Sequence, residues 1–189
     1  MSAARRPPLL VLGWGNPSRG DDALGPLFLE RLGAGLSTAQ RPQVECLEDF
    51  QLQIEHALDL RGRRQLLFVD ASLDSAPPFT VRPVLAQRDR SISSHALSPE
   101  ALLQVYEDLE GCPAPEALLL AIRGQEFGLG QPLGAAAESH LQAALAWARG
   151  WLTQLDLDGP RALTGPSKAA GPWPDANAAD AAAPRPAGP

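Results

Sequence analysis

The sequence predicts an α/β fold: an open, mostly parallel twisted sheet of about five strands with helices on both faces. Short apolar runs typical of buried strands alternate along the chain with segments whose apolar residues recur at helical spacing. The 189 residues, 44% of them hydrophobic, are enough for one domain with a substantial core. No apolar run approaches the roughly 18 residues that a membrane helix needs.

The first elements follow from apolar spacing and from the residues that interrupt it. An apolar run at 9–12 predicts a buried strand, which ends at Gly13. Apolar residues at i, i+3, i+4 and i+8 then define one face of a helix over 24–32. Pro26 lies in its first turn, where no N–H needs a partner, and glycines follow its last turn. Further along we expect a strand at 44–47, a helix at 52–60 and a strand at 65–69 that ends at Asp70.

The second half continues the alternation. Residues 79–85 alternate in polarity and contain Pro83, which favours an edge strand. Ser98 is a good N-cap for a helix that begins at Pro99. The remaining predicted elements are that helix over 99–109, a buried strand over 117–122 and a helix over 135–155.

The composition changes near Leu157 and divides the chain into two parts. Residues 7–155 form the predicted folded domain. Residues 158–189 are dominated by Ala, Pro and Gly and have no hydrophobic periodicity. Such a segment buries too little apolar surface to offset its ordering entropy, so we expect a flexible tail.

Composition and charge also exclude several classes of function. The formal net charge is -6, so the chain lacks the basic surface that binds nucleic acid. The apolar stretch behind the N-terminal arginines is too short for a signal peptide, and we expect a cytoplasmic protein without a membrane partner. Two distant cysteines, Cys46 and Cys112, do not make a disulfide framework or a Cys-rich zinc site.

The loop after the first strand is the most informative segment. It reads Gly-Trp-Gly-Asn-Pro-Ser-Arg-Gly-Asp-Asp and leads from a buried strand into a helix, which is the usual frame of a phosphate site. Asp21 and Asp22, however, would repel an anion and attract a cation. The loop also lacks the third glycine of the dinucleotide fingerprint, and the chain has neither a P-loop nor a serine-hydrolase or zinc-peptidase motif.

Three candidate metal ligands follow from the predicted topology. Ligands of such sheets bind at the carboxyl ends of the strands. Asp22 follows the first strand, Asp70 ends the third, and His95 precedes the helix at 99–109. Two carboxylates and one imidazole suit a divalent ion such as nickel or zinc. Close carboxylates disfavour each other's ionisation, so at least one should titrate abnormally in the metal-free protein.

Each of these residues, taken alone, has a simpler explanation. The Asp pair could cap a helix, Asp70 could cap a neighbouring helix, and His95 could lie on the surface. The interpretation as metal ligands is supported only by the predicted convergence of all three residues at one edge of the sheet. His56 and His140 fall in helical segments without an acidic partner at a strand end, and we interpret them as structural.

The motifs together resemble those of the hydrogenase maturation endopeptidases, over about residues 9–150. The resemblance rests on Gly13-x-Gly15-Asn16 with Asp21-Asp22-x-x-Gly25, Val69-Asp70-Ala71, Ser94-His95, and Arg123-Gly124-x-Glu126-Phe127-x-Leu129-Gly130. The sequence of the first motif is similar to that of the branch of the family that processes soluble, NAD-linked hydrogenases.

The resemblance implies an endopeptidase that removes the C-terminal extension of a nickel-loaded hydrogenase large-subunit precursor. Nickel in the precursor would be the recognition element and a Lewis acid, and the protease itself would hold no permanent metal. The family's metal-contacting, catalytic residues map onto Asp22, Asp70 and His95. Many members have Glu at the position of Asp22, so the shorter Asp side chain keeps the charge but changes the distance at which the carboxylate could contact the metal. The tail is not part of the family pattern.

Supporting roles and alternatives remain open at this point. Asn16 and Asp21 are candidates to orient the ligands, and Asp21 is also a candidate base. A non-catalytic, metal-dependent chaperone that binds the hydrogenase precursor would have the same residues. A nucleotide-binding module is a third alternative.

Overall fold

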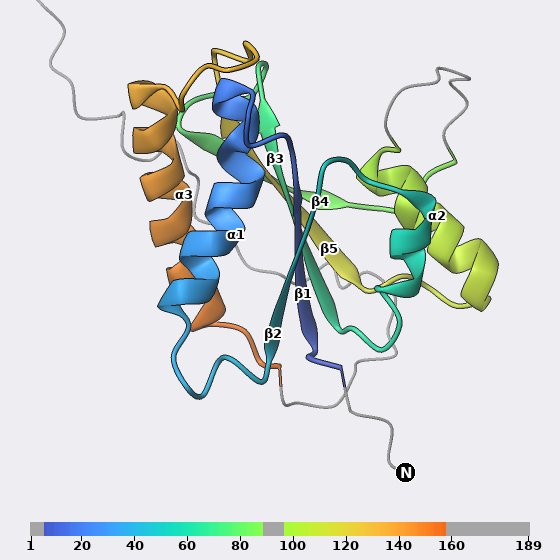
Figure 1. Cartoon of the computed structure of the whole chain (residues 1–189). Helices are drawn as coiled ribbons and strands as arrows, with labels where there is room; N and C mark the ends of the chain where they lie inside the picture. Colours follow the sequence, from blue (N-terminus) through green and yellow to red (C-terminus); the bar gives the residue numbers. More distant parts are fainter. Residues whose placement is uncertain (1–5, 89–96, 158–189) are drawn as a thin grey trace, which may run out of the picture.

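The computed structural model describes residues 6–88 and 97–157 and contains one five-stranded sheet in the order β2-β1-β3-β5-β4. Four strands are parallel to one another: β1 (Leu9–Trp14), β2 (Val44–Asp49), β3 (Gln65–Ser72) and β5 (Glu116–Arg123). The edge strand β4 (Phe79–Val84) is antiparallel to β5. The predicted open, mostly parallel sheet is therefore confirmed (Figure 1).

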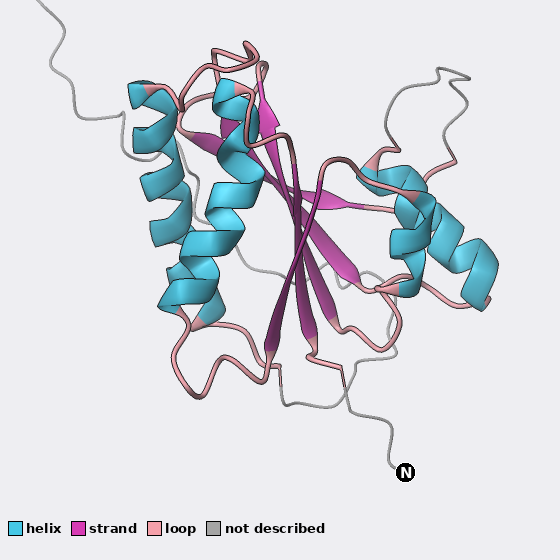
Figure 2. Ribbon diagram, viewed as in Figure 1, coloured by secondary structure: helices cyan, strands magenta, loops and turns pink. Residues whose placement is uncertain are grey.

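Helices cover both faces of this sheet, as predicted (Figure 2). One face carries α1 (Leu24–Gly35) and α3 (Ala135–Leu152), and the other carries α2 (Pro99–Glu110) and the short 3-10 helix η2 (Ile54–Leu58). Along β1, Leu9 and Val11 belong to the core under α1 and α3, while Leu10 and Leu12 belong to the core under α2. Burial on both faces explains why this strand is a continuous apolar run.

Two strands extend beyond their predicted ends, and this changes the position of a candidate ligand. β1 includes Gly13 and Trp14, and β3 continues past Asp70 to Ser72. The extension of β3 is stabilised by β5, because Asp70 pairs with Ala121 and the ladder continues to the end of both strands. Tertiary pairing here overrides the local polarity that suggested an earlier end. Asp70 is therefore the third residue from the end of β3.

The helix predicted over 52–60 is wrong. Only residues Ile54–Leu58 are helical, and they form a 3-10 turn. The buried residues of this short helix are His56 and Ala57. Ser98 caps α2 as predicted, since its Oγ accepts the N–H of Ala101 at 3.2 Å.

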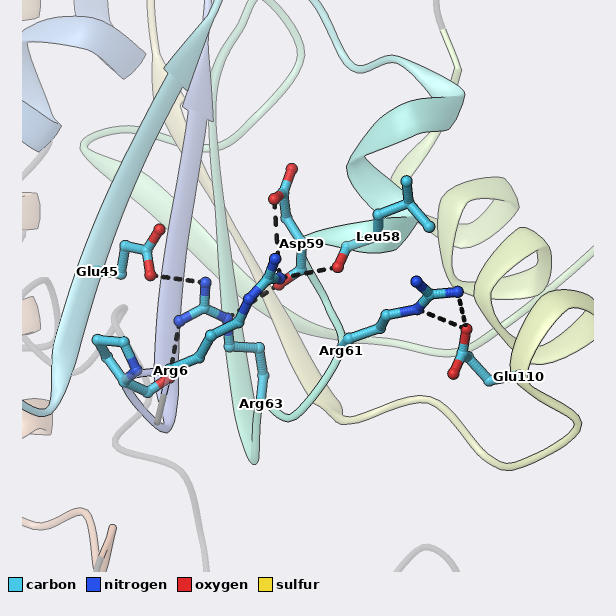
Figure 3. Close-up of polar contacts among 8 residues, drawn as sticks. Arg6, Glu45, Leu58, Asp59, Arg61, Arg63 and Glu110 are labelled. Carbon is cyan, nitrogen blue, oxygen red and sulfur yellow. Dashed lines mark hydrogen bonds and ion pairs between the residues drawn. The ribbon is translucent and has the colours of Figure 1, made fainter. Parts of the chain in front are cut away.

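A buried arginine fixes the amino ends of the strands, opposite the candidate site (Figure 3). Arg63 is 1% exposed, and its guanidinium donates to the carbonyls of Asp59 (2.9 Å) and Pro7 (2.8 Å) and to Glu45 Oε2 (2.7 Å). It thereby ties the segments before β1 and β3 to β2. Arg61 forms a more exposed pair with Glu110 nearby.

Two further sequence expectations bear on the described residues. None of the described helices combines the length and hydropathy that crossing a bilayer requires. Cys46 and Cys112 are both free thiols, but Cys46 is only partly buried and Cys112 is exposed, so an expectation of two buried thiols is wrong. The predicted tail at 158–189 lies outside the described residues.

Candidate active site at the carboxyl edge of the sheet

The loop after β1 folds back tightly onto the start of α1. Gly15 has a φ of +143°, and a Cβ there would lie 2.0 Å from the carbonyl oxygen of Asp22. A Cβ on Gly25 would lie 2.3 Å from the carbonyl oxygen of Trp14. Only glycine fits at either position, because contacts this short do not occur for a real side chain. The two glycines therefore bring Asp22, which lies in the 3-10 helix η1 (Gly20–Ala23), against the end of β1.

Asp22 is half-buried and is oriented by the loop itself. Its Oδ2 accepts the backbone N–H of Asn16 at 3.0 Å. The side chain of Asn16 in turn accepts the N–H of Ser18 at 2.9 Å, which stabilises this turn of the loop. Asn16 thus contacts a candidate ligand directly, through its main chain.

Asp70 has the most perturbed carboxyl group at this edge. Its pKa is raised from the ordinary 3.8 to about 7, mainly by burial and to a smaller extent by the negative charge of Asp22. Hydrogen bonds from the Ala71 backbone and the Trp14 side chain oppose this rise without cancelling it. Trp14 is held by an edge contact with Phe68, their ring centroids 6.2 Å apart. The pKa of one of the two carboxyls is therefore abnormal, as predicted, but burial is a larger cause than the neighbouring carboxylate.

Two of the three predicted ligands are thus close enough to interact electrostatically. His95 lies outside the described residues, and its place in the ligand set stays a prediction. Within residues 6–88 and 97–157, no group of three His, Cys, Asp or Glu side chains could hold a metal ion. Two neighbouring carboxylates supply hard oxygen donors and negative charge for a dication, and a complete site would need a further ligand.

Asp21 has a structural environment that the sequence did not predict. It is 1% exposed, and its carboxylate accepts three backbone N–H groups, from Gln125 (2.7 Å), Glu126 (3.0 Å) and Gly134 (2.8 Å). Burial alone would raise its pKa, but these three donors, together with the nearby His140, hold the pKa below its ordinary value. Asp21 therefore anchors the loop that follows β5.

Main-chain contacts extend this junction between the two loops. The N–H of Gly20 donates to Gln131 at 3.0 Å, that of Asp21 donates to Glu126 at 2.7 Å, and that of Gly130 donates to Ser18 at 2.7 Å. A Cβ on Gly124 would meet the Phe127 ring at 2.8 Å and the Asp21 Cβ at 3.0 Å. The Arg123–Gly130 motif is thus explained by its close packing against the loop after β1.

His56 has a partner that sequence reasoning missed. Its Nε2 lies 3.2 Å from Oδ2 of Asp49, and its Nδ1 accepts the N–H of Gln53 at 3.0 Å. The expectation that His56 has no acidic partner at a strand end was wrong, because β2 continues to Asp49 instead of ending at residue 47. Since Asp49 is in register with Trp14, this pair lies at the same edge of the sheet. His140 instead contacts the carbonyl of Arg123 at 2.8 Å.

Comparisons of sequence alone do not identify a relative. No protein-family model matches the chain, and no curated protein does.

Solved structures do resemble it. The NiFe hydrogenase maturation protease HycI from Thermococcus kodakarensis superposes with a TM-score of 0.62 at 21% identity, over 77% of this chain and 92% of that one. The hydrogenase maturating endopeptidase HybD from E. coli gives a TM-score of 0.60 at 23% identity, over 77% and 91%. An endopeptidase from Escherichia coli gives 0.58 at 23%, over 76% and 91%. This chain therefore has the fold of the hydrogenase maturation endopeptidases.

Proposed function

We propose that this protein is an endopeptidase that removes the C-terminal extension of a nickel-loaded hydrogenase large-subunit precursor. The observation that carries the proposal is the pair Asp22 and Asp70 at the carboxyl edge of β1 and β3, with the pKa of Asp70 raised to about 7. Perturbed carboxyls in such a position are typical of functional sites. The solved structures with this fold that are described above are hydrogenase maturation proteases and endopeptidases.

Nickel enters this proposal as part of the substrate. Asp22, Asp70 and His95 would contact the ion of the incoming precursor, and the protease would hold no permanent metal. A carboxyl with a pKa near 7 gives up its proton readily when a dication approaches, so Asp70 suits transient binding. An ion held beside the scissile bond would polarise the carbonyl or lower the pKa of a water molecule.

The neighbouring residues would position these ligands. Asn16 orients Asp22, and Trp14 donates to Asp70. The carboxylate of Asp21 is occupied by three backbone donors, which favours a positioning role over that of a base. Its anchoring of the loop after β5 keeps the adjacent Asp22 in place.

The direct test is cleavage of purified precursor, followed by intact-mass spectrometry of the large subunit. The unaltered protein should shorten the nickel-loaded precursor and leave the metal-free precursor intact. Asp70→Asn and His95→Ala should each abolish cleavage. The matched control is Asp74→Asn, which removes an exposed carboxylate just after β3. Normal cleavage by either site variant would show that the assigned ligands are wrong.

The same assay separates the proposal from a precursor-binding chaperone. A chaperone would form a complex with the precursor, detected by native gel electrophoresis, without changing its mass. That the substrate is the precursor of a soluble, NAD-linked hydrogenase stays a prediction. It is tested by asking which large subunit keeps its extension in cells that lack this protein.

A further inference from the structure

Three large apolar side chains are exposed just beyond the carboxyl ends of the parallel strands. Phe50 follows β2 and is 68% exposed, Leu73 follows β3 and is 55% exposed, and Leu129, in the loop after β5, is 76% exposed. Single exposed apolar residues are common on protein surfaces. What distinguishes these three is that they recur at one edge, after three strands of one sheet.

Strand pairing and one hydrogen bond between loops place all three at the edge of the sheet that carries the candidate site. Phe50 is next to Asp49, which is in register with Trp14 of β1. Leu73 is next to Ser72, the last residue of β3. Leu129 precedes Gly130, whose N–H donates to Ser18 in the loop after β1. Figure 1 shows these strands running in the same direction, so their carboxyl ends share the edge that carries Asp22 and Asp70.

The loops that present these side chains are held by local hydrogen bonds. The Phe50 N–H donates to Asp49 Oδ1 at 2.6 Å. Ser72 Oγ accepts the N–H groups of Asp74 (3.2 Å) and Ser75 (3.1 Å), which closes the turn that carries Leu73. A partner that covered these side chains would therefore not have to order the loops first, which lowers the entropic cost of docking.

Charge restricts the partner that fits here. The apolar side chains share one edge of the sheet with Asp22 and Asp70, and the carboxylate of Asp49 lies at the same edge. This arrangement is complementary to a protein surface that presents a cation within an apolar surround, and it would repel an anionic surface. Under the proposed function, the nickel ion of the precursor would supply the cation, and the apolar surface around it would face Phe50, Leu73 and Leu129.

We propose that Phe50, Leu73 and Leu129 form an apolar collar that docks the folded body of the nickel-loaded precursor around its metal. The proposal rests on the proposed function and extends it, because recognition would then depend on a protein surface in addition to the ion. The collar would contribute to binding of the substrate without contacting the reacting atoms. Its loss should therefore raise KM and leave kcat unchanged.

The test compares Phe50→Ser, Leu73→Ser and Leu129→Ser with Leu109→Ser in steady-state cleavage of the nickel-loaded precursor. Leu109 is a matched control because it is 52% exposed but lies at the opposite edge of the sheet. It is near the end of α2, and its neighbour Glu110 pairs with Arg61, which precedes β3. Each collar substitution should raise KM by about tenfold with kcat within twofold of the unaltered protein, since covering a large apolar side chain contributes about this much to affinity. Leu109→Ser should leave both constants unchanged.

The outcomes separate this inference from the proposed function. If the unaltered protein does not shorten the precursor, the proposed function is wrong. If it does, but the KM values of the collar variants match that of Leu109→Ser, the collar is not a docking surface. A fall in kcat at constant KM would likewise overturn the inference, because it would assign these residues to the chemical step.

Discussion

Replacing Asp70 by Asn should make the metal-free protein more stable, and increasingly so as the pH rises. The folded-state pKa of Asp70 lies above the ordinary value, so the folded protein keeps a proton that the unfolded chain has already lost. Between the two pKa values the folded state binds more protons, and the free energy of unfolding falls as the pH increases. Asn does not titrate, so the variant does not lose stability with pH in this way.

The magnitude follows from the two pKa values. A rise from 3.8 to about 7 is worth about 4 kcal/mol of lost stability at pH values well above 7. Asp70 is only partly buried, and solvent screening reduces this figure. Some of the loss is already present at pH 4.5. Between pH 4.5 and pH 8 we therefore expect the stability difference between Asp70→Asn and the unaltered protein to grow by about 2 kcal/mol.

Urea denaturation at these two pH values, with EDTA present, measures this difference. All groups that are common to the two proteins cancel in the comparison. Asp74→Asn, which removes an exposed carboxylate at the same edge, should differ from the unaltered protein by the same amount at both pH values. A gap between Asp70→Asn and the unaltered protein that stays constant within about 0.5 kcal/mol would refute the linkage argument.

Other substitutions test the framework of the site by urea denaturation at neutral pH. Asp21→Ala should cost about 4 kcal/mol, because three buried N–H groups lose their acceptor. The stability that comes from the lowered pKa of Asp21 is lost progressively as the pH falls below the ordinary 3.8, so the deficit should shrink there. Arg63→Met should cost about 3 kcal/mol and Arg61→Met less than about 1 kcal/mol; equal losses would contradict the contrast between a buried and an exposed arginine. Gly15→Ala should leave little soluble protein, since its Cβ would overlap the main chain of Asp22; near-normal stability would show that the loop rearranges easily.

The architecture was predictable because the inner parallel strands β1, β3 and β5 are covered on both faces and therefore contain continuous apolar runs. Leu9 to Leu12 could be identified without any knowledge of their partners. The ends of the strands were less predictable, since they depend on how far the neighbouring strand continues. Asp49 was missed for this reason, and with it the partner of His56.

The candidate site was predictable in outline and not in its internal contacts. Asp22 and Asp70 could be placed at one edge from topology alone, because parallel strands end together. The role of Asp21 could not be derived in this way. Its acceptor atoms contact N–H groups that are 104 to 113 residues away in the chain, and no local pattern encodes such a contact.

The close packing of the loop after β1 against α1 affects how strongly Asp22 would bind a cation. Gly15 and Gly25 fix Asp22 from the side of β1, and Asp21 fixes the same turn from the side of β5. A carboxylate that is braced from two directions loses little freedom when it captures a cation. Under the proposed function, weak ligands would then suffice, and the enzyme would have to release its product after every turnover.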